Sequence, residues 1–364
     1  MNLLFVGTLP QTQIGGGMTH FVALARAMLE AGHQVDVIAH PRGSIARALE
    51  GTGARIFPGQ FRNVFDLRGY AAVRRTVRAR RPDVLVSNFG KEYWPLVLCG
   101  RLLGVPVALF RHRLPPMSAA SEYLLPRVAQ HFFAVSDYAR EVYAARGMPR
   151  ERIKVLYNPV DTMRFRPDPA WGRSIRARFD LPDEAIVVGF VGRFYGSKGV
   201  FELESALREA MAREPRLHAL WIGDSPEQHA LRERVIGAPH AARHRLVGWI
   251  DDAELPGYYN ACSMVVFAPV MAETFGRVAI EAQACGVPVL VSDLGGTAET
   301  VEPDVGGLLL PTGDVAALRD GILRLCDPAL REPMGRAART SAERRFSLPV
   351  IAEAFARQLR GPGG

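Results

Sequence analysis

The chain is poor in lysine and in cysteine. Among its 45 basic residues only Lys91, Lys154 and Lys198 are lysines, and the others are arginines. The four cysteines are scattered through apolar segments, without a Cys-x-x-Cys or a Cys–His pattern. This distribution is typical of buried thiols in a reduced compartment, and it excludes a disulfide framework and a zinc finger.

Long apolar runs and metal-binding patterns are also missing. No apolar stretch approaches the ~20 residues that a membrane-spanning helix needs. Residues 1–7 lack the basic leader and the cleavage site of a signal peptide. No Asp-x-Asp occurs, and no His, Asp or Glu cluster has metal-ligand spacing. We therefore expect a cytoplasmic protein without a metal or other cofactor.

What the sequence does contain is an alternation of strand and helix patterns from end to end, which indicates parallel sheets with crossover helices. At 364 residues and 48% hydrophobic, the chain can bury a large core, and its length favours two domains. The predicted strands cover 3–6, 35–39, 84–87, 105–110, 132–135 and 154–157 in the first half, and 186–191, 218–222, 245–247, 264–268, 287–292 and 308–310 in the second.

A linker separates the two halves. Pro159, Pro167 and Pro169 fall in a stretch without hydrophobic period. We predict a first domain over 1–163, a second over 164–344, and a C-terminal helical segment, 345–364, that returns to the first domain. Each would be a Rossmann-like, doubly wound α/β domain, which binds ligands outside the carboxyl ends of its strands. Two such facing domains predict a cleft between them.

Positive charge is concentrated in one helical segment. The formal net charge is +8, so an anionic partner is expected. Five arginines crowd residues 74–81, but no aromatic residues interleave with them, and nucleic acid is not the expected partner. Peripheral contact with an anionic membrane, or a phosphorylated lipid acceptor, fits better. The alternative, that these arginines form an ordinary solvent-exposed helix face, is equally well supported.

A glycine-rich turn in the second half carries two basic side chains. Gly192, Gly196 and Gly199 surround Arg193 and Lys198. Glycines let the backbone approach a bulky anion, while arginine supplies a planar fork of donors and lysine a point charge. This combination suits a diphosphate.

Two glutamates follow about eighty residues later. Glu273 is expected in the loop after strand 264–268, and Glu281 in a helix that begins near Phe275. Eight helical residues rise ~12 Å, so the carboxylates cannot share a proton. Each can hold another part of one elongated ligand, while the N–H groups of Thr274, Phe275 and Gly276 favour an anion. Together with the basic turn, the pair predicts a nucleotide sugar; alone, both are equally well ordinary surface residues.

Several motifs occur in a fixed order along the chain. They are Gly15-Gly16-Gly17, Asn158-Pro159-Val160-Asp161, Gly192-Arg193-x4-Lys198-Gly199, Glu273-x7-Glu281 and Gly295-Gly296-x2-Glu299. In their order and spacing, the chain resembles the family 4 retaining glycosyltransferases, which have the two-domain GT-B fold. The similarity covers most of the chain.

The resemblance implies a role for each motif. Arg193 and Lys198 would bind the donor diphosphate, Glu281 the ribose, and Glu273 the transferred sugar. Gly16 and Gly17 would approach the phosphates from the other domain. A front-face mechanism, in which the donor phosphate takes the acceptor proton, is also implied.

Single residues at predicted strand ends are further candidates. His112 follows strand 105–110, and in similar enzymes a histidine here lies near the C6 hydroxyl of the donor sugar; the alternative is a loop residue bonded to its neighbours. Arg111 and Arg113 are weaker candidates for an acceptor phosphate. Trp249 either flanks the nucleobase or packs at a domain edge. His20 is expected on a helix, facing an acceptor loop.

The predicted protein is a metal-independent retaining glycosyltransferase in which His112, Arg193, Lys198 and Glu273 act in catalysis. Its donor is a nucleoside diphosphate sugar, with a UDP-sugar favoured, and its acceptor a saccharide or lipid-linked glycan. Cell-surface polysaccharide or lipopolysaccharide synthesis at the inner face of the cytoplasmic membrane is the expected setting. Two alternatives stay open: a nucleotide-sugar epimerase on the same scaffold, and a catalytically silent nucleotide-sugar-binding protein. A nicotinamide dehydrogenase is disfavoured, because the glycine loop at 15–17 is no G-x-G-x-x-G fingerprint.

Overall fold

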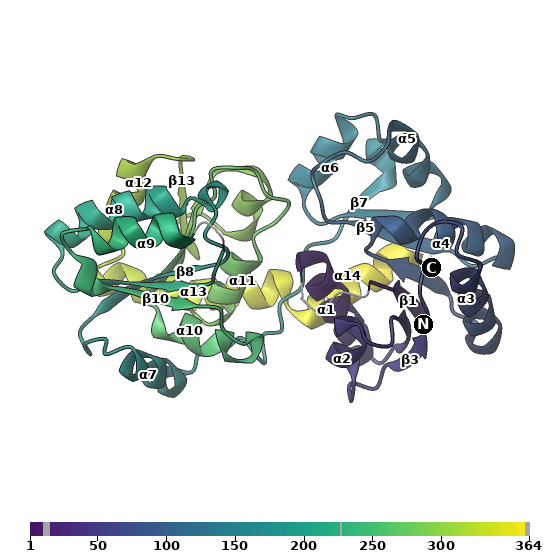
Figure 1. The fold of residues 1–364 in the computed structure, drawn as a ribbon, viewed down its shortest axis with the longest axis horizontal. Helices are drawn as coiled ribbons and strands as arrows, with labels where there is room; N and C mark the ends of the chain where they lie inside the picture. Colours follow the sequence, from purple (N-terminus) through teal and green to yellow (C-terminus); the bar gives the residue numbers. More distant parts are fainter. Residues whose placement is uncertain (10–14, 226–227, 361–364) are drawn as a thin grey trace. The chain divides into compact units, whose positions relative to one another are not determined.

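The computed structural model describes residues 1–9, 15–225 and 228–360, and the chain divides into two compact units (Figure 1). The first unit is Met1–Pro159 together with the chain from Leu348, and the second is Val160–Ser347. Each unit contains one parallel sheet with helices between successive strands. The predicted α/β class with two Rossmann-like units is confirmed.

The first unit is built on a seven-stranded sheet in the order β3-β2-β1-β4-β5-β6-β7. Its strands are β1 (Asn2–Gly7), β2 (Gln34–Ala39), β3 (Arg55–Pro58), β4 (Val84–Ser87), β5 (Val107–Arg111), β6 (His131–Ala134) and β7 (Ile153–Val155). Its helices are α1 (Gly16–Glu30), α2 (Ser44–Leu49), α3 (Leu67–Arg80), α4 (Gly90–Leu103), α5 (Ala119–Val128), α6 (Asp137–Ala144) and α14 (Leu348–Arg360).

Both faces of this sheet are buried. Leu3 and Phe5 of β1 pack in a cluster with residues of α1, α2 and α14. Leu4 and Val6, which alternate with them, pack in a second cluster with residues of α3, α4 and α5. Because successive side chains of a strand point to opposite faces, a parallel strand covered on both sides must be apolar throughout. The continuous apolar runs in the sequence have this cause.

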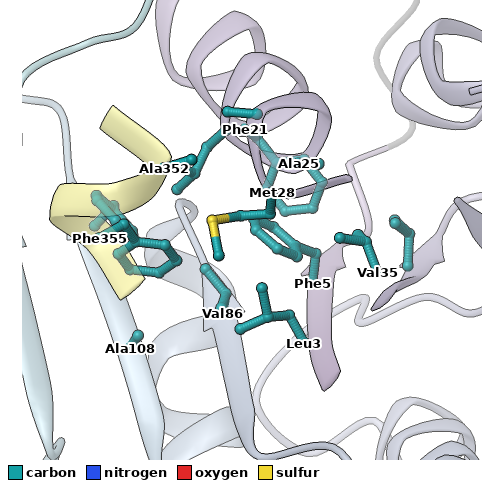
Figure 2. Packing of buried hydrophobic residues seen from close by; sticks show 14 of the residues in the cluster. Leu3, Phe5, Phe21, Ala25, Met28, Val35, Val86, Ala108, Ala352 and Phe355 are labelled. Atoms are coloured by element: carbon teal, nitrogen blue, oxygen red, sulfur yellow. The ribbon is translucent and has the colours of Figure 1, made fainter. Parts of the chain in front are cut away.

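The last helix, α14, belongs to the core of the first unit. Figure 2 shows Ala352 and Phe355 of α14 packed beside Met28 of α1. The Phe355 ring centroid lies 5.4 Å from that of Phe110 and 5.5 Å from that of Phe133. The predicted return of the C-terminal segment to the first domain is therefore observed through residue 360, and residues 361–364 lie outside the described part.

The observed unit boundaries differ slightly from the predicted ones. The chain passes between units at Pro159/Val160 and at Ser347/Leu348, instead of at 163/164 and 344/345. The Val160 N–H donates to the Phe346 carbonyl at 2.8 Å, and Val160 forms a parallel bridge with Ser347. These contacts join the two segments that connect the units to the second unit. No local pattern in the sequence indicates such contacts.

The second unit contains a six-stranded sheet in the order β10-β9-β8-β11-β12-β13. Its strands are β8 (Ile186–Val191), β9 (Leu217–Ile222), β10 (His244–Gly248), β11 (Met264–Phe267), β12 (Val289–Ser292) and β13 (Gly307–Leu310). Its helices are α7 (Pro169–Arg178), α8 (Val200–Arg213), α9 (Gln228–Ile236), α10 (Leu255–Ala261), α11 (Arg277–Ala284), α12 (Val315–Arg324) and α13 (Pro328–Phe346).

Every predicted strand is present, and one strand was missed. The missed strand is β3, a four-residue edge strand that pairs only with β2 and ends in Pro58. Most of its side chains are exposed. An edge strand needs no apolar run, and proline is tolerated there because one side of the strand makes no ladder bonds. In the described part of the chain, no helix is both long and apolar enough to cross a bilayer.

Stability of the second unit should depend on His244, which is buried at the start of β10. The Trp221 Nε1–H donates to His244 Nδ1 at 3.1 Å, and burial lowers the pKa of His244 from 6.5 to about 4. As the pH falls below 6.5, the unfolded chain therefore takes up the proton first. Acidification from about pH 7.5 to about pH 5 should cost about 2 kcal/mol of unfolding free energy through this group.

The measurement is urea denaturation of the wild type and of His244→Gln at both pH values. The variant should lose about that much less stability on acidification, since the other titrating groups are common to both proteins. Equal pH dependence of the two proteins would contradict the assignment.

Candidate active site

Three glycines bring the ends of β8, β9 and β10 together. The Gly192 N–H donates to the Ile222 carbonyl, and the Gly223 N–H to the Gly248 carbonyl, both at 2.9 Å. A Cβ atom on Gly223 would lie 1.9 Å from the Gly192 oxygen, and Gly223 has a φ of +135°. Only glycine is tolerated at this contact. The close approach therefore holds the ends of these strands against one another at the carboxyl edge of the sheet.

A cavity of about 190 Å³ lies at these strand ends. Its lining includes Arg193, Asp224 and Trp249, which follow β8, β9 and β10 respectively. The Trp249 side chain is 75% exposed, so it is not packed in the core of its unit. Arg193 is exposed as well, and it makes no ion pair with any described residue. The guanidinium group of Arg193 and the exposed ring of Trp249 therefore line the same small cavity.

Lys198 and Glu273 are in direct contact. Lys198 ends the short 3-10 helix Gly196–Lys198 after β8, and its Nζ forms an ion pair with the Glu273 carboxylate in the loop after β11. Two backbone bonds tie these loops together, because the Ser197 carbonyl accepts from the N–H groups of Val270 at 3.1 Å and Met271 at 3.3 Å. Two residues 75 positions apart therefore meet at the carboxyl edge of the sheet.

The glycine after Lys198 makes this approach of the two loops sterically feasible. Gly199 has a φ of +76°, and a Cβ atom there would lie 2.0 Å from the Ala268 carbonyl oxygen. A side chain at this position would force the turn that carries Lys198 away from the loop that carries Glu273. The glycine of the predicted motif is thus required by packing between two strand ends.

The helix that carries Glu281 begins later than predicted. It starts at Arg277, so Glu273 lies outside it, and Thr274, Phe275 and Gly276 directly precede its first turn. The Gly296 N–H donates to the Glu273 carbonyl at 2.9 Å and holds that residue in the loop. The estimate of a helical rise between the two carboxylates was therefore wrong, although the two remain on separate elements.

Glu281 is buried and held by two donors. The Tyr259 hydroxyl donates to Oε2 at 2.9 Å, and Arg277 Nη2 donates to Oε1 at 2.8 Å. Burial, together with the nearby carboxylate, raises the pKa of Tyr259 well above its usual value, so the phenol stays protonated and donates. Sequence reasoning missed both partners, although the spacing of Arg277 and Glu281, one helical turn apart, was an available signal for their ion pair.

In the first unit, His112 lies against the start of α1. A Cβ atom on Gly17 would lie 3.6 Å from His112 Cδ2, and the rings of His20 and His112 have centroids 4.5 Å apart. Asn88, which follows β4, donates from Nδ2 to the Gly17 carbonyl at 3.0 Å and lies 2.9 Å from His20 Nδ1. Gly16 begins α1 without a side-chain cap at Gly15.

One prediction for this unit was wrong. His20 lies on α1 as expected and is buried in the contacts just described, and its place facing an acceptor loop stays a prediction. Arg111 is also buried, 3.6 Å from the Glu122 carboxylate and over the Tyr143 ring, so its charge is neutralised inside the unit. Arg113 is exposed. Asn88 was missed, although its place directly after a buried strand was a signal.

The other two lysines bind backbone carbonyls. Lys91 Nζ donates to the carbonyls of Thr8 at 3.3 Å and Phe61 at 3.0 Å, and Lys154 Nζ donates to that of Gln358. Lys198 alone among the three lysines pairs with a carboxylate at a strand end. Within the described ranges, no three His, Cys, Asp or Glu side chains are grouped so that they could hold a metal ion.

Two Rossmann-like units, each with candidate ligand-binding residues at its strand ends, define a GT-B glycosyltransferase fold. HepE from Anabaena, solved in complex with UDP, has a TM-score of 0.84 over 100% of both chains at 22% identity. Sucrose-phosphate synthase from Thermosynechococcus elongatus has a TM-score of 0.73, covering 99% of this chain and 98% of that chain, at 23% identity.

The sequence comparisons identify the family. Residues 14–164 match the model "Glycosyltransferase Family 4", and residues 173–341 match "Glycosyl transferases group 1". D-inositol 3-phosphate glycosyltransferase of Acidothermus cellulolyticus is 31% identical over 75% of this chain and 67% of its own. The enzyme of that name from Kribbella flavida is 29% identical over 90% and 87%. The chain belongs to the family 4 glycosyltransferases.

Proposed function

We propose that this glycosyltransferase transfers a sugar from a nucleoside diphosphate sugar, with a UDP-sugar favoured, to a hydroxyl of a saccharide or lipid-linked glycan. The contact between Lys198 and Glu273 carries the proposal. It holds a cation suited to phosphate beside a carboxylate suited to sugar hydroxyls, with Arg193 on the same turn. HepE, which has the same fold, was solved with UDP and with UDP-glucose.

Lys198 and Arg193 would stabilise the leaving group. When the bond between the anomeric carbon and the phosphate oxygen breaks, negative charge grows on the diphosphate. Preorganised cations and the N–H groups at the start of α11 favour that charge in the transition state. These groups belong to the chain itself, so we propose that the reaction needs no metal ion.

Glu273 would orient the sugar instead of attacking it. Its carboxylate is neutralised by Lys198, which makes it a weak nucleophile. We propose retention by a front-face reaction: the acceptor oxygen bonds to the anomeric carbon, the carbon–phosphate oxygen bond breaks, and the acceptor proton passes to the leaving diphosphate. In the first unit, Gly16 and Gly17 would bind phosphate oxygens, and His112 a sugar hydroxyl.

Glu281 would bind the ribose of the donor. Tyr259 and Arg277 each take one lone pair of a different carboxylate oxygen, which fixes the carboxylate plane and leaves further lone pairs for ribose hydroxyls. Trp249 would flank the base at the cavity that it lines.

The exposed arginines of α3 support a setting at a membrane. Arg74 and Arg78 are exposed, and α3 carries no acidic residue between its ends to neutralise them. We propose peripheral contact with the anionic inner face of the cytoplasmic membrane, in the synthesis of cell-surface polysaccharide or lipopolysaccharide. The lipopolysaccharide outer core galactosyltransferase WaaB has a similar fold, with a TM-score of 0.71 at 18% identity.

The first test is calorimetric binding of UDP, GDP, ADP and NAD in EDTA. UDP should bind without metal, and Trp249→Ala should weaken it about tenfold, as expected for the loss of one stacked base. Ile236→Ala, which also removes an exposed apolar side chain, is the matched control and should bind UDP normally. Binding of NAD alone, or of no nucleotide, would contradict the proposed donor.

The second test follows the product of the transfer reaction by NMR. Incubation with UDP-glucose and a saccharide acceptor should give a glycoside with the anomeric configuration of the donor. An inverted product would contradict retention, and a new nucleotide sugar formed without acceptor would identify an epimerase.

A further inference from the structure

The first unit contains a cavity that the proposed donor site does not use. It has a volume of about 740 Å³ and lies at the carboxyl ends of β2 and β3, beside α3. None of Gly16, Gly17 and His112 lines it. The volume falls in the range of ligand pockets, and the carboxyl edge is where open parallel sheets bind ligands.

Four arginines line this cavity. They are Arg42 after β2, Arg62 after β3, and Arg68 and Arg75 of α3. Among the described residues, none of their guanidinium groups forms an ion pair. This differs from Arg55 and Arg80, which both pair with the buried Asp36, at 2.9 and 3.0 Å. Two neighbouring arginines therefore share one buried carboxylate, whereas the four of the cavity form no ion pair within the described part of the chain.

The single acidic residue of the lining does not balance them. Asp66 caps α3, and its carboxylate accepts from the backbone N–H groups of Arg62 at 2.9 Å and Arg68 at 3.1 Å. Its two oxygens are thus directed to the backbone. Four like charges in one cavity repel each other, and an anion with several oxygens relieves that repulsion. The planar fork of arginine matches a phosphate group in bidentate fashion.

We propose that this cavity binds a phosphate ester carried by the acceptor. That the ester belongs to the acceptor rests on the proposed function, whereas the affinity of the cavity for a phosphate ester does not. The ester is part of a soluble phosphorylated saccharide or of a phospholipid headgroup. The second source has a physical basis: Phe65 and Leu67, between lining residues Arg62 and Arg68, are 83% and 79% exposed, and apolar side chains beside arginines suit a lipid surface.

The experiment compares two double variants of the full chain. Arg62→Ala/Arg75→Ala removes two charges from the cavity. Arg101→Ala/Arg152→Ala, the matched control, removes two exposed charges of the same unit that do not line it. Glucose 1-phosphate, with glucose as blank, is titrated by calorimetry. Vesicles of phosphatidylcholine, with and without phosphatidic acid, are tested by cosedimentation, and UDP binding is measured on every variant.

We expect the cavity variant to bind the phosphate probe at least about tenfold more weakly, because it lacks two charged donors to the phosphate oxygens. UDP binding should stay at the wild-type value, and the control should lose less than about twofold in affinity for the probe. If the cavity variant loses affinity for glucose 1-phosphate, the ester belongs to a soluble phosphorylated saccharide. If it loses affinity only for vesicles with phosphatidic acid, the ester belongs to a phospholipid headgroup.

Equal losses in both variants would overturn the proposal, because a general surface charge would then explain the binding. Absence of binding of both phosphate probes to the wild type would overturn it as well. If the wild type binds the phosphate probe but not UDP, the proposed donor site fails while the cavity assignment stands.

Discussion

Replacing Lys198 by alanine should lower kcat for sugar transfer by about 10²- to 10³-fold, the loss typical of one preorganised donor to developing negative charge. The side chain ends the turn after β8 and contacts Glu273. Its removal takes a cation from the leaving diphosphate and releases the carboxylate that would orient the sugar. Both effects act on the transition state, so kcat should fall more than the affinity for UDP.

The measurement is steady-state transfer from the UDP-sugar, with UDP affinity determined in parallel. Arg213→Ala, which removes an exposed cation at the end of α8, is the control and should retain wild-type kcat. The losses of Lys198→Ala and Glu273→Ala should not add in the double variant, because the two side chains are in contact. Turnover of Lys198→Ala within a few-fold of wild type would show that the leaving-group role is wrong.

Replacing Phe355 by alanine should lower the unfolding free energy of the first unit by about 3–5 kcal/mol, the usual cost of removing a buried aromatic ring. Phe355 is fully buried in α14, and its ring contacts those of Phe110 and Phe133. Both neighbours belong to strands of the first unit, although α14 follows the whole second unit in the chain. The cavity left behind lies in the core under the sheet.

Urea denaturation followed by hydrogen exchange separates the two units. Protection should fall for amides of β5 and β6 and stay unchanged for those of β8 and β11, which lie in the other unit. Glu353→Ala, an exposed change on the same helix, is the control and should shift stability by less than about 0.5 kcal/mol. Equal stability of Phe355→Ala and the control would contradict the packing of α14 in this core.

Local sequence patterns determined much of this protein. Strands such as β8 and β12 are buried on both faces and therefore appear as uninterrupted apolar runs. The glycine-rich turn with Arg193 and Lys198, and the two glutamates eight positions apart, were recognised as candidate ligands because their chemistry and spacing are local. The family and its fold followed from the order of these motifs.

The tertiary structure alone decided which side chains meet. The ion pair of Lys198 with Glu273, and the bond from Tyr259 to Glu281, join residues on different elements. Arg111 was expected to face an acceptor and is buried against Glu122 instead. The exposed edge strand β3 had no local signal, because an edge strand needs no apolar run. Of the charged cavity beside it, the sequence indicated only Arg75, within the basic segment 74–81. The sequence therefore determined the types of chemical groups, and packing between distant elements decided which of them are neutralised and which remain able to bind a ligand.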